Sequence, residues 1–285
     1  WDRIKLQQIE WFAERKPAIA LQTRAADRKK LIAEEERRKT PLWKDFVLAN
    51  ESAEAMSRVV RDSQDFPLLS GGDVNLYSLF VERAQALAHE NGIIGLLTPS
   101  GIAADKGAAE FFRSVSGAGR LGALFDFENR NNPGGSFFPD VDSRFKFCVL
   151  VFGAAQRRFE AARCAFYLHA IEELQDPDKL IPLAAEDFLR LNPNTGAAPI
   201  FRSRRDAELT TRIYAQHPVL VNRSNGSEVK AWPVKYATMF HMSNDSGLFL
   251  TRAELIQQGY KPVPLNRWQN TQGAVAVPLY EGKMV

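Results

Sequence analysis

Cysteine is scarce in this sequence, and its two occurrences, Cys148 and Cys164, each lie within or beside an apolar run. They show no CxxC spacing and have no companion histidines, which argues against a disulfide framework and against a zinc knuckle. A chain without such a framework suits a reducing compartment, so we expect a cytoplasmic protein.

Long apolar runs are also missing. None approaches the ~20 residues that a membrane-spanning helix needs, and no signal peptide is recognisable, so we expect no membrane partner. The four histidines are scattered without the spacing of a metal site, so we expect no metal centre. A net charge of +3 is too small to indicate a partner by itself.

What the sequence does contain is enough apolar residues for a folded core. The chain has 285 residues, of which 45% are hydrophobic and 25% are charged. That length admits one large core or a domain and a half, because single cores stop growing at roughly 250–300 residues. The sequence opens on Trp1 with no initiator methionine, and we expect it to be a fragment of a longer protein.

Helical patterns dominate the first part of the chain. Leu6–Glu14 predicts an amphipathic helix that stops near Pro17, and Ala53–Asp62 predicts another. Arg24–Lys39 predicts a charge-dense helix with seven basic and four acidic residues. We interpret it as a solvated arm stabilised by pairs of opposite charge. Contact with nucleic-acid phosphate is the alternative.

The middle of the chain alternates between helical and strand-like patterns. One helix ends near Asn91-Gly92, and the strand Ile93–Leu97 follows it, buried on both faces because it shows no polar alternation. The apolar face of that helix groups six positions: Leu76, Leu79, Phe80, Arg83, Ala84 and Leu87. The further segments are a helix over Asp105–Ser116, with Ala108, Phe111, Phe112 and Val115 turned inward, and strands over Leu121–Phe127 and Phe145–Phe152.

This rhythm predicts an α/β domain with a mostly parallel sheet. The last two strands are joined by a loop without a helix, so we expect an antiparallel hairpin that closes one edge of the sheet. Beyond Gly153 prolines become frequent and helices are isolated, at Ala184–Leu191 and Arg204–Gln216. A mixed α+β region should therefore begin within residues 155–180.

The strand at Ile93–Leu97 ends abruptly in the small polar turn Thr98-Pro99-Ser100-Gly101. In open α/β sheets, ligands bind at the carboxyl ends of strands, where loops of small residues leave room. The turn is therefore a candidate wall of a ligand site, although a tight turn that only leads into a helix fits the pattern as well.

Three segments, in order, resemble the amino-methylating adenine DNA methyltransferases of restriction–modification and phage-defence systems. The first is similar to the helix–strand–helix after the family's catalytic loop, and the second to its closing hairpin. The third is similar to the region beyond that hairpin in the large fused or multi-gene subclass. The segments read GDVNLYSLFVERAQALAHENGIIGLLTPSGIAADKGAAEFF, then FDFENRNNPGGSFFPDVDSRFKFCVLVF, then MFHMSNDSGLFLT with VPLYEGKMV. Together they span most of Asp73–Val285.

The resemblance implies a fold and a domain organisation. Residues 1–155 correspond to the second half of the doubly wound sheet of a class I S-adenosylmethionine-dependent methyltransferase, with a charged helical insertion over residues 18–65. Residues 156–285 correspond to a connector and the start of a DNA target-recognition region.

The activity that the resemblance implies is site-specific methylation of adenine N6, with S-adenosylmethionine donating the methyl group to an adenine flipped out of the duplex. Trp1-Asp2-Arg3 resembles the residues after the two prolines of the family's Asn/Asp-Pro-Pro-aromatic loop, which makes Trp1 the catalytic aromatic residue. Phe138, before Pro139, matches the aromatic residue that sandwiches the flipped base from the other side.

Other positions are assigned by the same resemblance. Asn75 and Tyr77 match a segment that borders the cofactor pocket, and Thr98, Pro99 and Ser100 match the strand end that walls the target-base pocket. The family's Gly-rich cofactor loop, its ribose-binding acid and the Asn-Pro-Pro residues are missing from the sequence. We therefore expect the full-length parent, rather than this chain alone, to bind S-adenosylmethionine and to catalyse.

The resemblance also implies double-stranded DNA as a partner, with a nuclease or helicase domain or subunit of the same system as a further one. Arginine donates bidentately to phosphate, and a cluster of arginines opens and follows the predicted helix at Arg204–Gln216. We expect six basic residues to contact DNA: Arg202, Arg204, Arg205, Arg212, Arg223 and Lys230. A solvated basic face is the alternative for the first four, and Arg223 and Lys230 belong to a separate predicted loop.

Three other functions are compatible with parts of the sequence. The first is a non-catalytic DNA-binding or specificity module of such a system. The second is a nuclease, because FPDVDSRFK superficially resembles a metal-dependent nuclease motif, although three residues separate Asp142 from Lys146 where that motif has one. The third is another S-adenosylmethionine enzyme that acts on RNA or protein.

Overall fold

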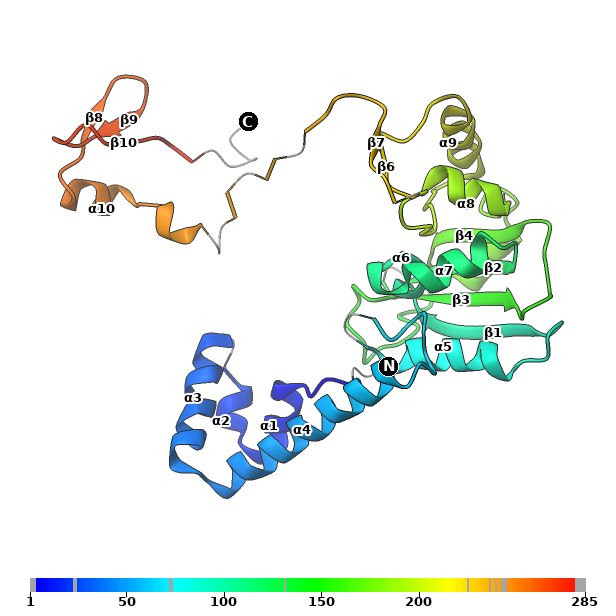
Figure 1. Cartoon of the computed structure of the whole chain (residues 1–285), viewed down its shortest axis with the longest axis horizontal. Helices are drawn as coiled ribbons and strands as arrows, with labels where there is room; N and C mark the ends of the chain where they lie inside the picture. The colour runs from blue at the N-terminus through cyan, green and yellow to red at the C-terminus, as the bar shows by residue number, and fades with distance from the viewer. Residues whose placement is uncertain are drawn as a thin grey trace. The chain divides into compact units, whose positions relative to one another are not determined.

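The computed structural model describes residues 4–22, 25–71, 74–130, 132–224, 226–235, 237–238, 240–241 and 245–279 (Figure 1). Contacts divide the chain into two compact units, Trp1–Trp232 and Pro233–Val285. In the part of the chain described, no helix is both long enough and apolar enough to traverse a lipid bilayer. Trp1, predicted to be catalytic, and the final segment 280–285 lie outside the described residues.

Helices occupy nearly all of residues 8–62. They are α1 (Gln8–Arg15), α2 (Pro17–Ala20), α3 (Ala25–Arg38) and α4 (Pro41–Asp62). Pro17 ends α1 but begins α2, because the first turn of a helix does not need the N–H that proline lacks. The hydroxyl of Thr40 caps α4 by accepting a bond from the Trp43 N–H at 3.1 Å. The predicted helices are confirmed, with the last one beginning earlier than Ala53.

A small core of their own holds these helices together. Its buried members are Phe12, Ile19, Ile32 and Phe46. The ring of Phe46 lies 5.0 Å from that of Phe12, 5.2 Å from that of Trp11 and 5.7 Å from that of Trp43. On the outer side, α3 carries the predicted pairs of opposite charge, such as Lys30 with Asp27 at 3.7 Å. These four helices, α1 to α4, form what we call the helical arm. The helical arm has an aromatic interior and a charged exterior.

A five-stranded sheet and its helices form the centre of the first unit (Figure 1). The elements are α5 (Leu76–Leu87), β1 (Ile93–Pro99), α6 (Gly101–Ala104), η1 (Lys106–Ala108), α7 (Ala109–Ser116), β2 (Leu121–Glu128), β3 (Lys146–Gly153), β4 (Ala162–Leu168), η2 (Ile171–Gln175), β5 (Ile181–Leu183), α8 (Ala185–Leu191) and α9 (Arg204–Gln216). The strand order is β1-β3-β2-β4-β5. The predicted α/β class is thus confirmed, and the helices predicted at α8 and α9 are present.

The sheet is mixed, and the expectation of a mostly parallel sheet is wrong. β3 pairs antiparallel with β1 and β2, β4 pairs antiparallel with β5, and β2 with β4 is the parallel pair of this sheet. Neighbouring parallel strands need a long crossover, usually a helix, and the segments from β2 to β3 and from β3 to β4 contain none. The predicted β2–β3 hairpin is confirmed, but β3 lies between β1 and β2 instead of closing an edge.

The main core lies on one face of this sheet. Leu124 of β2 and Leu150 of β3 pack there with side chains from α5 to α9, including Phe111, Phe112 and Phe188. The predicted inward residues of α7 and the turn before it are all buried. The sheet and the helices that pack on this face therefore form the two layers expected of an α/β domain.

The opposite face carries a smaller cluster, in which Phe127 packs with Phe137 and Phe147. This cluster does not extend to Ile93 or Leu97 of β1, which are 56% and 42% exposed. The prediction that this strand is buried on both faces is therefore wrong. An unbroken apolar run fits a doubly covered strand, but it does not require one.

The buried side of α5 also differs from the predicted one. Tyr77 and Val81 are buried in the main core, whereas Phe80 and Leu87 are 68% and 73% exposed. The helix has apolar residues on two sides, so its sequence period alone does not decide which side packs on the sheet.

Short elements complete the chain. In the first unit, β6 (Val221–Asn222) pairs with β7 (Val229–Lys230). The second unit contains η3 (Ser246–Leu248), α10 (Arg252–Gln257), β8 (Lys261–Val263), β9 (Arg267–Gln269) and β10 (Val275–Ala276). Its three strands form an antiparallel sheet in the order β10-β9-β8. A capping box of Thr251 and Glu254 begins α10.

Candidate functional site at the carboxyl edge of the sheet

β1, β2 and β4 run in the same direction, so they end at one edge of the sheet, where the antiparallel β3 begins. Polar side chains gather at this edge. Together with Phe138, they make up what we call the carboxyl-edge site: Thr98, Ser100, Asp126, Glu128, Asn129, Lys146, Tyr167 and His169.

The turn after β1 is tied to its neighbours by its two hydroxyl groups. Thr98 is 2% exposed, and its hydroxyl oxygen lies 3.5 Å from Sγ of Cys148. The hydroxyl of Ser100 donates to Oδ1 of Asp126, which joins the end of β1 to that of β2. Of the three residues predicted to wall a base pocket, Thr98 thus faces the core, while Pro99 and Ser100 are half-buried.

Asp126 is a buried acid, 5% exposed, whose two oxygens have different partners. Oδ1 accepts from Ser100, whereas Oδ2 accepts no hydrogen bond within the described ranges and has the Lys146 ammonium at 3.6 Å. Burial raises the pKa of Asp126, against the opposing effects of Ser100, Lys146 and the backbone N–H of Tyr167.

Glu128 is the centre of the charge network. Oε1 lies 3.0 Å from Nζ of Lys146, and Oε2 lies 3.2 Å from Nε of Arg130 and 3.2 Å from Nε2 of His169. Burial alone would raise the pKa of Glu128, but its bonds to Arg130, Lys146 and His169 outweigh that effect and lower the pKa to about 2. Lys146 thus bridges two buried acids from the neighbouring strand.

Tyr167 adopts an uncommon backbone conformation, with a φ of 57°. It sits where the pairing of β2 with β4 is irregular, between Ala165 and Leu168. Its ring contacts two cations, with the ring centroid 4.3 Å from Nζ of Lys146 and 5.1 Å from Cζ of Arg202. Left-handed backbone at a residue other than glycine is held by its surroundings and is common at functional sites.

The loop between β2 and β3 presents Phe138, which is 37% exposed. Asn129, 1% exposed, clamps this residue: its Nδ2 donates to the Phe138 carbonyl at 2.9 Å, and its Oδ1 accepts from the Phe138 N–H at 2.9 Å. The Phe138 ring meets the Phe147 ring edge-on at 5.0 Å. Phe147 pairs with Pro99 across β1 and β3. The half-exposed ring is therefore held next to the strand end that carries the polar turn.

Tyr77 and Asn75, predicted to border a cofactor pocket, lie at the start of α5. Tyr77 is 6% exposed, and burial raises its pKa. A side chain on Gly101 would meet the Asp105 carboxylate and, at 3.3 Å, the Tyr77 hydroxyl, which explains the glycine of the turn. Asn75 is the half-buried residue before α5. These two residues do not by themselves make a cradle for S-adenosylmethionine.

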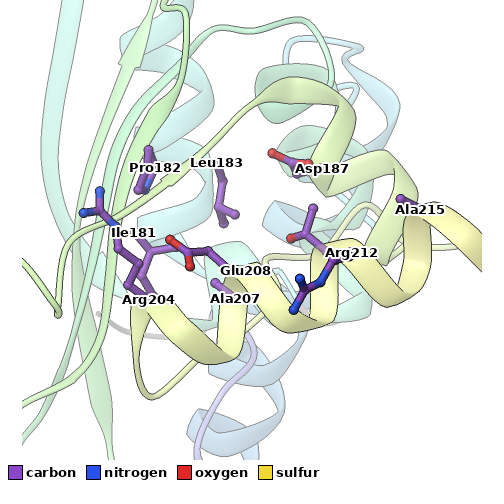
Figure 2. Close-up of a pocket in the computed structure, with 10 residues that line it drawn as sticks. Ile181, Pro182, Leu183, Asp187, Arg204, Ala207, Glu208, Arg212 and Ala215 are labelled. Atoms are coloured by element: carbon purple, nitrogen blue, oxygen red, sulfur yellow. The ribbon is translucent and has the colours of Figure 1, made fainter.

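Two of the predicted DNA-binding arginines line a cavity of about 410 Å³ between β5, α8 and α9 (Figure 2). Arg204 and Arg212 share one side of α9 with Glu208, and Asp187 of α8 faces the same cavity. Arg205, next in sequence to Arg204, is exposed and does not line it. The floor is apolar, with Ile181, Leu183 and Ala207. The cavity is lined by both charges, which suits a mixed polar ligand better than a phosphate.

The remaining predicted contacts divide between two places. Arg202 is exposed and joins the carboxyl-edge site through the Tyr167 ring. Arg223 and Lys230 share one carboxylate, that of Glu228, at 2.7 and 3.0 Å. The β6–β7 hairpin that carries this group is therefore partly neutralised.

Sequence reasoning missed Asp126, Glu128, Lys146 and Tyr167. A signal for the first two was present, because FDFE at the end of an apolar strand puts two acids on one face at a carboxyl end. Lys146 follows from the hairpin register, which places it opposite Glu128. Nothing local indicates the conformation of Tyr167. In the ranges described, no group of three or more His, Cys, Asp and Glu side chains is placed to hold a metal ion.

Comparison with known proteins adds little to this geometry. No family model and no curated protein match the sequence. Among solved structures, one titled as a cryo-EM structure of a DrdV–DNA complex is similar over 47% of this chain, with 12% sequence identity and a TM-score of 0.31. The match spans 15% of that chain's length. A likeness of this degree carries no conclusion about activity or partners.

Proposed function

We propose that this chain is part of an adenine-specific DNA methyltransferase, and that its carboxyl-edge site receives an adenine turned out of the duplex. The observation that carries the proposal is Phe138, a half-exposed ring clamped beside the end of β1. The residues that resemble the family in sequence, Phe138 and the Thr98–Ser100 turn, come from separate segments and meet here through Phe147. The position of the site at the carboxyl ends of β1, β2 and β4 is where open α/β sheets bind ligands.

Binding of a flipped adenine explains why the site combines an aromatic ring with polar side chains. Flipping a base out of the stack costs a few kcal/mol, and stacking on an aromatic face recovers about 1–3 kcal/mol. Phe138 supplies such a face, and its fixed backbone orients the base. S-adenosylmethionine, when bound in the complete family pocket, supplies the methyl group. The polar residues of this chain would hold the edge of the base and exclude water from it.

Transfer of tritium from labelled S-adenosylmethionine to unmethylated genomic DNA tests this function. The assay compares residues 1–285 with a longer form extended upstream, and a Phe138→Ala version of the longer form is the control for the site. We expect label in adenine with the longer form and a loss of roughly 5- to 150-fold with Phe138→Ala. Absence of label with every form would contradict the proposal.

Arg202 gives a separate prediction about DNA. If its guanidinium, held against the Tyr167 ring, contacts one phosphate, Arg202→Ala reduces the slope of log affinity against log salt by about 0.9. The matched control is Arg190→Ala, because Arg190 is ion-paired with Glu186 and Asp187 on α8. Fluorescence anisotropy of labelled duplex DNA over a salt series measures both. Equal slopes for wild type and Arg202→Ala would rule out this contact.

The second candidate function is a DNA-binding module without catalysis. It is favoured by Tyr77, which is 6% exposed and so offers little surface to a cofactor. DNA binding with the predicted salt slope, but no label transfer by the longer form, would establish this alternative.

A further inference from the structure

We infer that Asn129 is the positioning residue that makes Phe138 a rigid platform for the flipped base, an inference that rests on the proposed function. Asn129 directly follows β2 and is not among the site residues predicted from the sequence. It acts through Phe138 and does not itself present an exposed surface, because it is 1% exposed.

Both ends of the Asn129 amide are used. Its Nδ2 donates to two carbonyl oxygens, those of Phe138 at 2.9 Å and Val141 at 3.2 Å. Its Oδ1 accepts from the Phe138 N–H at 2.9 Å, and its own backbone carbonyl accepts from the Ser136 hydroxyl at 3.1 Å. A side chain with a donor and an acceptor at one tip is required, because neither an ionised acid nor an apolar residue offers both.

The clamp leaves Phe138 in an unusual combination of states. Its backbone is fixed at the N–H and at the carbonyl, yet its ring is 37% exposed and contacts the protein edge-on at Phe147. An exposed aromatic side chain on a loop that is held by buried polar bonds is typical of a preorganised binding surface. Binding then loses less freedom than it would on a mobile loop.

Asn132 provides a matched control in the same loop. Its Nδ2 also donates to two backbone carbonyls, those of Glu128 at 3.2 Å and His169 at 2.7 Å. It makes no bond to residues 136–141 in the described structure. Asn→Asp at either position sets a carboxylate oxygen against two backbone carbonyls. The two sites differ in that Asn129 Oδ1 also accepts from the Phe138 N–H, whereas Asn132 Oδ1 accepts no hydrogen bond within the described residues.

The first experiment follows the ring itself. 4-Fluorophenylalanine is placed at position 138 of the protein of residues 1–285. Its ¹⁹F resonance is recorded for wild type, Asn129→Asp and Asn132→Asp. We expect a dispersed signal in wild type and in Asn132→Asp, and a shift to the unfolded-chain position in Asn129→Asp. Circular dichroism confirms that each variant folds. An unmoved signal in Asn129→Asp, or the same movement in both variants, would overturn the inference.

The second experiment measures coupling in the longer form that transfers methyl groups to genomic DNA. We expect Asn129→Asp to lower kcat/KM on the order of tenfold, and Asn129→Asp with Phe138→Ala to be no slower than Phe138→Ala alone. The reductions in kcat/KM caused by Asn132→Asp and by Phe138→Ala should multiply in the double variant. If the reductions caused by Asn129→Asp and Phe138→Ala also multiply, the positioning role of Asn129 is overturned. If wild type transfers no methyl group, the proposed function fails, and the ¹⁹F result still decides whether Asn129 holds Phe138.

Discussion

Replacing Lys146 with methionine is expected to lower the free energy of unfolding by about 3–5 kcal/mol at pH 7. The ammonium group bridges Glu128 at 3.0 Å and Asp126 at 3.6 Å, and both acids are buried. Removing it leaves two carboxyl groups of β2 without their shared cation. A buried charge that loses its partner is far more costly than a surface pair that is broken.

The dependence on pH identifies the cause. The pKa of Glu128 is about 2 in the folded chain against an ordinary 4.5, so its contribution is complete above about pH 4.5 and is lost as pH falls toward 2. Asp126 has the opposite effect on stability. Its pKa is raised in the folded chain, so folding disfavours its ionised form, and its ionisation lowers the free energy of unfolding as pH rises. Without Lys146 the pKa of Glu128 rises, so the variant should lose less stability on acidification than wild type.

Urea unfolding at pH 7 and at several values down to pH 3 measures both effects. Lys179→Met is the control, because the Lys179 ammonium pairs with Glu173 at 3.4 Å in a more exposed setting. Its loss should be below about 1 kcal/mol. Equal losses for the two lysine variants would show that the carboxyl-edge network does not hold the sheet together.

Phe46→Ala is expected to unfold the helical arm and leave the sheet folded. The Phe46 ring is 6% exposed and contacts the rings of Trp11, Phe12 and Trp43 in a cluster separate from the main core. Truncation of a buried phenylalanine costs about 3–5 kcal/mol. A core with so few buried members has little stability left after such a loss.

Tryptophan fluorescence measures this change directly, because Trp11 and Trp43 border the cavity that the variant creates. We expect a red shift and a loss of helical circular dichroism, with the amide protection of β2 and β3 retained. Met56→Ala on the same helix is the control, since Met56 is 57% exposed and should change stability by less than about 0.5 kcal/mol. Loss of β-sheet protection in Phe46→Ala would show that the two clusters fold as one.

Much of the fold could be predicted because local patterns dominate it. Apolar runs at β1, β2 and β3, and the 3.6-residue period of α7 and α9, indicate elements whose type tertiary contacts do not change. The polar turn Thr98–Gly101 lies at a strand end that joins the carboxyl-edge site, which a rule about open sheets anticipates.

Strand order could not be predicted, because it depends on contacts between distant segments. The loop of residues 129–145 reads as a hairpin connection, but nothing in it states that β3 also pairs with β1. The buried side of α5 was ambiguous for a related reason: Tyr77 and Phe80 are both aromatic, and packing on the sheet selects Tyr77.

The candidate site was predicted where a family pattern marked it or where a polar turn ends a strand. Phe138 and Ser100 carry such a pattern, whereas Lys146, Tyr167 and Asn129 acquire their roles from register, a backbone irregularity and a loop clamp. Each of these arises from pairing across the hairpin or between strands, so a single sequence holds no local trace of it.

The most direct test of the proposed function is the modified base itself. Genomic DNA from cells that express the longer form, with and without Phe138→Ala, is digested to nucleosides, and N6-methyl-2′-deoxyadenosine is quantified by mass spectrometry. We predict the modified nucleoside with the intact site and a large reduction with Phe138→Ala. Equal amounts with both forms, or methylation found only on another base, would contradict an adenine held against Phe138.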